Sequence, residues 1–192
     1  MIIKNNKWSV IIMAKKVLII STSLRGGSNS DILARECERG ALEAGKEADY
    51  ISLKGKDIQY CIGCLSCQNT KKCVLNDDVA PIMEKVKNAE AIVFATPIYY
   101  YEMAGQLKTL LDRLNPLYSS DYSFRDIYMI ATAAEDGKST YEKAYNGLQG
   151  WVDCFEKAKL KGIVFGGGIN DANSATDFKN VMEKAYKLGK EI

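Results

Sequence analysis

Five short strand-like runs, separated by segments of helical periodicity, dominate the pattern of hydrophobic and polar positions along the chain. The first run, Val17-Leu-Ile-Ile-Ser21, is continuously apolar and ends in a small polar residue, which is typical of a strand buried on both faces. Pro97 follows the third run and is expected to stop it, because proline donates no hydrogen bond to a sheet. The pattern predicts strands over residues 17–21, 48–53, 91–96, 127–132 and 160–165.

Helical periodicity fills the intervals between these runs. In the first interval, Ile32, Leu33 and Cys37 recur at the spacing of one helical face. Asp77-Asp78 is expected to open another helix, where acidic residues suit the helix dipole. Helices are predicted over residues 28–45, 77–88, 103–114, 140–158 and 175–188. Because strand and helix alternate five times, we expect an α/β fold, a three-layer sandwich around a five-stranded parallel sheet.

The composition narrows the range of functions. A chain of 192 residues favours one domain, and 47% hydrophobic with 26% charged residues is typical of a globular protein. The net charge of +2 gives no reason to expect nucleic acid or a membrane as partner. Histidine is absent, which excludes a histidine general base, a Ser-His-Asp triad and histidine-ligated metals.

Residues 1–12 are interpreted as an N-terminal extension, because Met13-Ala-Lys-Lys-Val17 resembles a natural start. We therefore expect a single domain over residues 13–192. Lys15 and Lys16 interrupt the apolar N-terminal stretch, and no small-residue cleavage site follows, which argues against a signal peptide. The stretch is also too short and too charged to span a bilayer. We expect a cytoplasmic protein, in which thiols stay reduced.

Four cysteines lie close together at Cys61, Cys64, Cys67 and Cys73, in the spacing C-x2-C-x2-C-x5-C. Such a run places several thiols on the inside of one loop, where they suit an iron–sulfur cluster. Two alternatives remain open, a structural zinc site and a loop of unligated or redox-active thiols. The other two cysteines, Cys37 and Cys154, fall on predicted helix faces and are expected in the core.

The loop after the first predicted strand suggests a phosphate site. Ligands of open parallel sheets bind beyond the carboxyl ends of the strands, where the strand order reverses. The loop from Ser21 to Ser30 has neither a dinucleotide fingerprint nor a Walker motif. It is rich in hydroxyl groups, contains Arg25 and opens a helix, which together suit a single phosphate. The alternative is that Ser28 or Asn29 only caps the helix.

The loops after the third and fourth predicted strands suggest a flat aromatic ligand. Tyr99, Tyr100 and Tyr101 are adjacent, so at least one should be exposed, either as a wall for a flat ring or as a subunit contact. Residues 133–137 include small side chains that let the backbone approach a ring closely. One phosphate, one flat ring and no nucleotide motif together suggest FMN.

Three sets of motifs carry a family resemblance. They are Thr22-Ser-Leu-Arg25 with Ser28-Asn-Ser30; the run from Cys61 through Cys73 to Asp77-Asp78; and Thr96-Pro-Ile-Tyr99 with Gly105-Gln-Leu-Lys108 and Asp112-Arg113. With these motifs the chain resembles, from Lys16 to its end, the iron–sulfur flavoproteins within the flavodoxin-like NAD(P)H-dependent FMN reductases. The family usually has glycine where this chain has Thr22, and threonine does not take positive φ freely.

The resemblance implies a flavodoxin-like strand order of 2-1-3-4-5 and a homodimer or homotetramer with flavin sites near subunit contacts. It also implies that the four clustered cysteines, Cys61, Cys64, Cys67 and Cys73, ligate a [4Fe–4S] cluster. The residues implied around the FMN phosphate are Ser23, Arg25, Ser28, Asn29 and Ser30. Those implied around the isoalloxazine are Pro97, Ile98, Tyr99 and Tyr100, with Ala133, Ala134, Glu135, Asp136 and Gly137 on another edge.

The expected function is electron transfer between two-electron and one-electron partners, because flavin handles both and an iron–sulfur cluster carries one electron. NAD(P)H or a reduced ferredoxin would supply electrons, and a quinone, an oxygen species or a redox protein would receive them. No catalytic residue is assigned, although Tyr99, Tyr100 and Glu135 are acid–base candidates. The alternatives are a cluster-free NAD(P)H:quinone or azo reductase, a non-enzymatic flavodoxin-like carrier and a zinc-stabilised thiol switch without flavin.

Overall fold

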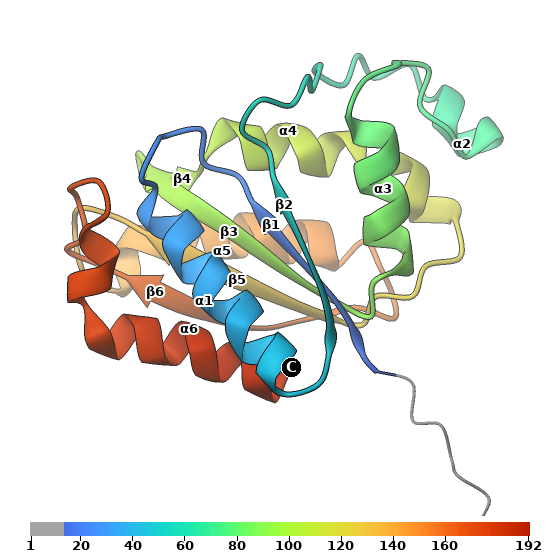
Figure 1. Cartoon of the computed structure of the whole chain (residues 1–192). Helices are drawn as coiled ribbons and strands as arrows, with labels where there is room; N and C mark the ends of the chain where they lie inside the picture. Colours follow the sequence, from blue (N-terminus) through green and yellow to red (C-terminus); the bar gives the residue numbers. More distant parts are fainter. Residues whose placement is uncertain (1–13) are drawn as a thin grey trace, which may run out of the picture.

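The computed structural model describes residues 14–192, so the predicted extension over residues 1–12 lies outside the described residues. One parallel sheet runs through the molecule (Figure 1). Its strands are β1 (Lys16–Ser21), β2 (Glu47–Ser52), β3 (Ala91–Tyr99), β5 (Asp126–Thr132) and β6 (Lys159–Gly166), and their order is β2-β1-β3-β5-β6. The predicted α/β class and parallel sheet are therefore confirmed.

A sixth, short strand corrects the predicted sheet. β4 (Glu102–Met103) pairs antiparallel with the end of β3, so the predicted five strands in the order 2-1-3-4-5 become six, with β4 off the parallel path. The prediction that Pro97 stops β3 is also wrong, because β3 continues to Tyr99 in register with β5 and β4. The Ala104 N–H donates to the Thr96 hydroxyl oxygen at 3.0 Å, which holds the returning chain against β3.

Helices cover both faces of the sheet and make a three-layer structure (Figure 1). α1 (Asn29–Glu43) and α6 (Lys179–Glu191) pack together on one face, and α3 (Val79–Asn88), α4 (Gly105–Arg113) and α5 (Lys138–Val152) cover the other. The remaining helical turns are α2 (Ser66–Thr70) and the 3-10 segments η1 (Asn115–Ser119) and η2 (Ser174–Asp177). No helix in residues 14–192 has the length and apolar character needed to cross a membrane.

Alternate side chains of each strand enter two separate cores. In β1, Leu18 and Ile20 pack with α3, α4 and α5, while Val17 and Ile19 pack with α1 and α6. Because helices cover both faces, neither face of β1 needs polar side chains. This arrangement explains why the strand is a continuous apolar run rather than an alternating one.

The two cysteines outside the clustered run differ in burial. Cys37 lies in the core as predicted, and burial raises the pKa of its thiol to about 12, so it stays protonated at neutral pH. The prediction that Cys154 is a core residue is wrong, because α5 ends at Val152 and Cys154 lies exposed in the following turn. Its thiol donates to the Gly150 carbonyl at 3.5 Å.

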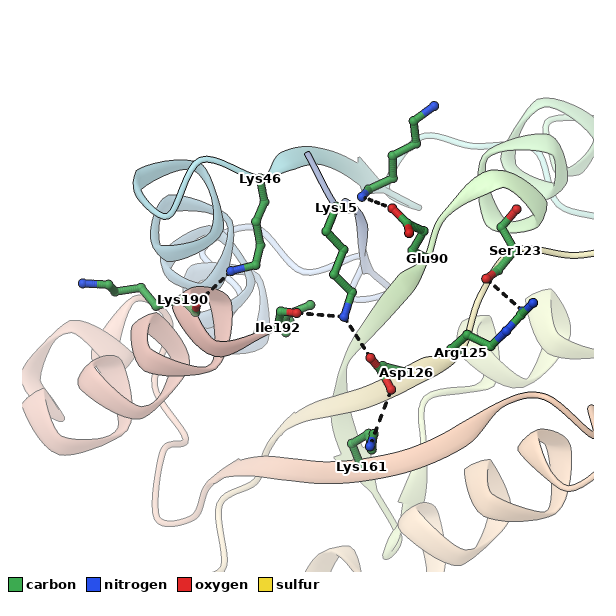
Figure 2. A network of polar contacts seen from close by, with 10 residues as sticks. Lys15, Lys46, Glu90, Ser123, Arg125, Asp126, Lys161, Lys190 and Ile192 are labelled. Carbon is green, nitrogen blue, oxygen red and sulfur yellow. Dashed lines mark hydrogen bonds and ion pairs between the residues drawn. The ribbon is translucent and has the colours of Figure 1, made fainter. Parts of the chain in front are cut away.

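A polar network lies at the amino ends of the parallel strands, at the opposite end of the sheet from the predicted site (Figure 2). The Lys15 ammonium donates to Asp126 Oδ2 and to the Ile192 carbonyl, both at 2.8 Å. Lys161 Nζ lies 3.7 Å from the other oxygen of Asp126. These contacts tie the end of α6 to the starts of β1 and β5. The carboxyl ends of the strands, where ligands of such sheets bind, lie at the other end of the sheet.

Candidate functional site

A cavity of about 200 Å³ lies at the carboxyl ends of β1, β3 and β5, where the predicted loops meet. We call it the main cavity. Its lining includes most of the residues predicted to bind a cofactor. They are Ser23, Arg25, Ser28, Asn29, Pro97, Ile98, Tyr99, Ala133 and Ala134, joined by Thr132, Ile169 and Asn170. Loops that are far apart in sequence therefore converge as the parallel topology requires.

A second cavity of about 210 Å³, the side cavity, adjoins the main cavity. Both cavities are lined by Ile98, Ala133 and Ala134, so the loops after β3 and β5 form a shared wall. The side cavity is lined in addition by Tyr100 and Glu135, which were predicted, and by Tyr101 and Thr140, which were not.

Three predicted residues lie outside both linings. Ser30 is fully buried, and its hydroxyl lies 3.1 Å from that of Ser28. The Gly137 N–H donates to the Asp136 carboxylate at 2.7 Å, just before α5. Asp136 and Gly137 are exposed, so none of the three predicted residues forms a cavity wall.

The loop after β1 combines capping with a polar cavity wall. The Asp31 N–H donates to Ser28 Oγ at 3.4 Å, so Ser28 caps α1, as the alternative interpretation expected. The Arg25 N–H donates to Ser23 Oγ at 3.3 Å. Thr22, which replaces the usual glycine of the family, does not have a positive φ. Its N–H and its hydroxyl both donate to the Ala95 carbonyl.

The loop after β6 holds the loop after β1 in place, a contact that was not predicted from the sequence. Arg25 Nη1 donates to the Asn170 carbonyl at 2.9 Å. Asn29 Nδ2 donates to the Asp171 carbonyl at 2.8 Å, and Asn29 Oδ1 accepts the Ala175 N–H at 3.1 Å. Both the nitrogen and the oxygen of the Asn29 amide are thus used in these contacts. Arg25 is held at the cavity wall through Nη1, and its guanidinium has further N–H donors.

The turn between β3 and β4 is a strained pair of tyrosines. Tyr99 pairs with Glu102, so Tyr100 and Tyr101 form a two-residue hairpin loop with φ of 51° and 66°. Asparagine and glycine are the usual residues for such a turn. All three tyrosines are exposed, and Tyr100 almost completely, at 98%. The Tyr101 hydroxyl donates to Glu135 at 3.0 Å, which raises its pKa and links the two loops of the side cavity.

Replacing Tyr100 with asparagine is expected to increase the free energy of unfolding by about 1 kcal/mol, because asparagine tolerates the left-handed region better than tyrosine. The exposed tyrosine loses little packing in the exchange. Urea unfolding measures the effect. Tyr118→Asn is the matched control, since Tyr118 is also exposed but has no positive φ. Equal effects of the two substitutions would contradict strain at Tyr100.

All four clustered cysteines line one pocket, which we call the cysteine pocket. Its walls are Cys61, Cys64, Cys67, Cys73, Ile62, Gly63, Leu65, Val74, Leu75, Asp112, Arg113, Asn115 and Pro116. Cys67 is buried, Cys73 is half-buried, and Cys61 and Cys64 are exposed. Within the described residues, no three cysteine or carboxylate side chains converge closely enough to hold a single metal ion.

Hydrogen-bond donors surround the sulfurs of the cysteine pocket. Asn115 Nδ2 donates to Cys67 Sγ at 3.1 Å. The backbone N–H and the hydroxyl of Ser66 lower the pKa of the Cys64 thiol. The Ser66 donors therefore favour the thiolate of Cys64 over its thiol, and thiolate is the form that binds metal.

The paired aspartates close the cysteine loop, which corrects their predicted role at a helix dipole. α3 begins only at Val79. The Gln59 N–H donates to Asp77 at 3.0 Å, and the Asp57 N–H donates to Asp78 at 2.8 Å. The two sides of the loop are therefore joined at its base, so residues 60–76 project as a closed unit.

A family model described as NADPH-dependent FMN reductase matches residues 15–156. The chain belongs to the NADPH-dependent FMN reductase family. The family and the enzyme class expected from the sequence are confirmed by this match. The matched segment contains the cysteine pocket and the loops after β1, β3 and β5, whereas the loop after β6 lies beyond it.

Two curated proteins similar to this chain are named iron–sulfur flavoproteins. The protein from Methanocaldococcus jannaschii is 41% identical over 102 residues, which cover 53% of each chain, so the match spans about half of that relative. The protein from Methanosarcina thermophila is 28% identical over 177 residues, covering 90% of this chain and 93% of the relative. A solved azoreductase from Bacillus anthracis superposes with a TM-score of 0.70 at 17% identity, over 93% of this chain and 100% of the other; this shows the shared fold.

Proposed function

We propose that the protein is an FMN-dependent oxidoreductase that passes electrons from NAD(P)H or a reduced ferredoxin to a quinone, an oxygen species or a redox protein. The observation that carries the proposal is the main cavity, which is polar where β1 meets α1 and apolar or aromatic along the loops after β3 and β5. That division matches a molecule with a phosphate at one end and a flat ring at the other.

The phosphate end of the proposed FMN site is the loop after β1. Ser23 and Ser28 present hydroxyls, Arg25 presents a cation, and the first turn of α1 presents free N–H groups. Arg25 keeps donors free while it holds the Asn170 carbonyl. An anion at this position is therefore paired with a fixed charge and with the positive end of a helix.

The ring end of the proposed site is the shared wall of the two cavities. Pro97, Ile98 and Tyr99 face the main cavity from β3, and Ala133 and Ala134 face it from the loop after β5. Small residues on one side and a broad aromatic residue on the other leave a slot suited to a flat ring. A bound FMN supplies hydride and one-electron chemistry there.

The proposal includes a [4Fe–4S] cluster held by Cys61, Cys64, Cys67 and Cys73. Its support is that all four thiols line one pocket with an arginine and an amide donor beside them. Four thiolates and a cluster are together anionic, and the Arg113 cation and the Asn115 amide are donors that suit them on a wall that also includes Asp112. Each thiolate of such a cluster binds a different iron, so the sulfurs need not converge on one point.

The proposal also includes a cytoplasmic homodimer or homotetramer. It is supported by Tyr99 and Tyr100, which are exposed beside both cavities in the manner of aromatic residues at subunit contacts. Sedimentation equilibrium is the direct test, and a monomer at all concentrations would remove this part of the proposal.

The test of the whole proposal is an absorption spectrum of protein purified without oxygen, with iron and sulfide assays on the same sample. We expect flavin bands over a broad visible shoulder, with about four irons and four sulfides per chain. Flavin alone would reduce the proposal to a cluster-free reductase, and absence of flavin would contradict it. Steady-state NAD(P)H oxidation with an added quinone then separates an enzyme from a simple electron carrier.

Replacing Arg25 with alanine is expected to weaken FMN binding about 10-fold to 100-fold, the range for loss of a charge-assisted hydrogen bond. Titration of the apoprotein with FMN measures it. Arg39→Ala serves as the control, because Arg39 lies farther along α1, away from the main cavity, and pairs with Glu36 and Glu43. Equal FMN affinity of the Arg25 variant and the unmodified protein would refute the phosphate role.

A further inference from the structure

Arg113 is the bulkiest fully buried side chain of residues 14–192, and it carries a charge. Nη1 and Nη2 donate to the two carboxylate oxygens of Asp77 at 2.6 Å and 3.0 Å. Nη1 also donates to the Gln59 carbonyl at 2.7 Å. Nε, a further donor of the guanidinium, has no hydrogen-bond partner among residues 14–192, which is rare for a buried polar group.

Arg113 borders the cysteine pocket, and Cys73 is its neighbour there. Burial lowers the pKa of Arg113, but Asp77 and the Cys73 sulfur outweigh burial and raise it. The guanidinium therefore lies between the buried Asp77 carboxylate and the thiols that line the pocket. Its unpaired Nε–H is a donor available to an anionic occupant of the pocket.

Closure of the cysteine loop does not by itself require this charge. A buried ion pair loses much of its Coulomb energy to desolvation, and apolar pairs of similar size often stabilise as well or better. A fixed cation with a spare donor is useful where a neighbouring group gains negative charge. Uptake of one electron makes an iron–sulfur cluster and its thiolates one unit more negative, and donors near the sulfurs set the potential of that step.

We propose that Arg113 is a positioning residue for the cluster, in which the guanidinium held by Asp77 turns Nε toward the Cys73 side of the pocket and raises the reduction potential of the cluster. This inference rests on the cluster of the proposed function. Asp77 has the opposite effect, because its negative charge offsets part of the positive charge of Arg113. The balance between the two sets how readily the cluster accepts an electron.

The test is the midpoint potential of the cluster, measured by EPR-monitored redox titration of the anaerobic holoprotein. For Arg113→Lys we expect the equilibrium constant for one-electron reduction to fall at least tenfold, about 59 mV, because the Nε donor is lost. For Asp77→Asn we expect a rise, because the offsetting charge is removed. Arg39→Lys, at an exposed ion pair on α1, should leave the potential unchanged.

Opposite shifts in the Arg113 and Asp77 variants support the inference, since loosening of the loop alone would move both in the same direction. If Arg113→Lys does not fold, the inference is tested by Asp77→Asn alone. A midpoint potential of the cluster in Asp77→Asn that is unchanged or lower than in the unmodified protein overturns the inference. If the unmodified protein has a cluster and the midpoint potential is unchanged in both variants, the role of Arg113 is overturned and the proposed function stays intact. Unmodified protein that binds flavin but no iron and sulfide overturns this inference and the cluster, and leaves the FMN-dependent oxidoreductase of the proposed function.

Discussion

Replacing Cys67 with alanine is expected to abolish iron and sulfide binding while FMN remains bound. Cys67 is the buried member of the four clustered thiols and receives the Asn115 amide hydrogen bond, so its loss removes a ligand that solvent cannot easily replace. Iron and sulfide should fall from about four each per chain to nearly none. The cysteine pocket and the main cavity share no residue, which is why the flavin content should not change.

Cys154→Ala is the matched control for this experiment. Cys154 is a free cysteine outside the pocket, and its thiol donates to the Gly150 carbonyl, so the control should keep its iron and sulfide. A Cys67 variant that retains full iron and sulfide would exclude these thiols as the ligand set. Zinc in place of iron in the unmodified protein would instead favour the structural zinc alternative.

The parallel sheet could be predicted because its information is local. The three central strands, β1, β3 and β5, are apolar runs with helical periodicity nearby, as burial on both faces requires, whereas the edge strands β2 and β6 are more exposed. β4 could not be predicted, because a strand of two residues has no period and forms only by pairing with β3. The same hairpin extended β3 beyond Pro97, where local rules expected a stop.

The candidate site divides in the same way. Ser23, Arg25 and Tyr99 could be predicted to lie together at one cavity, because loops at the carboxyl ends of parallel strands converge whatever their detailed conformation. The contribution of Asn170 was missed, because it depends on a contact with Arg25 across 145 positions of sequence. A run of glycines after the last strand, at residues 166–168, was visible in the sequence, but it does not indicate which loop it meets.

The paired aspartates illustrate how a correct motif can receive the wrong role. Asp77-Asp78 followed by apolar periodicity fits a helix start, and a helix does begin nearby at Val79. Asp77 does accept the Val79 N–H at 3.1 Å, but it also pairs with buried Arg113, 36 positions later in the chain. Local pattern reasoning assigns such a carboxylate to its own helix because the partner across the fold leaves no trace in the neighbouring sequence.

Replacing Asp77 with asparagine is expected to lower the free energy of unfolding by about 3–5 kcal/mol at neutral pH, because it leaves the buried Arg113 charge without its partner. Burial raises the pKa of Asp77, but the Arg113 guanidinium and the Gln59 and Val79 N–H groups outweigh burial and lower it. Urea unfolding of both proteins between pH 9 and pH 3, at about one-unit intervals, measures the effect and its pH dependence.

The lowered pKa fixes the sign of that dependence. An aspartate whose folded pKa lies below its unfolded value, about 3.9, contributes its full stabilisation above that value and loses it as the pH falls through the folded pKa. The gap between the two proteins should therefore stay constant from pH 9 to about pH 5 and narrow below about pH 4. Asp49→Asn is the control, because Asp49 forms an exposed pair with Lys85 and should cost no more than about 1 kcal/mol. A gap at Asp77 as small as that control, or one that widens in acid, would mean that the Asp77–Arg113 pair does not hold the base of the cysteine loop.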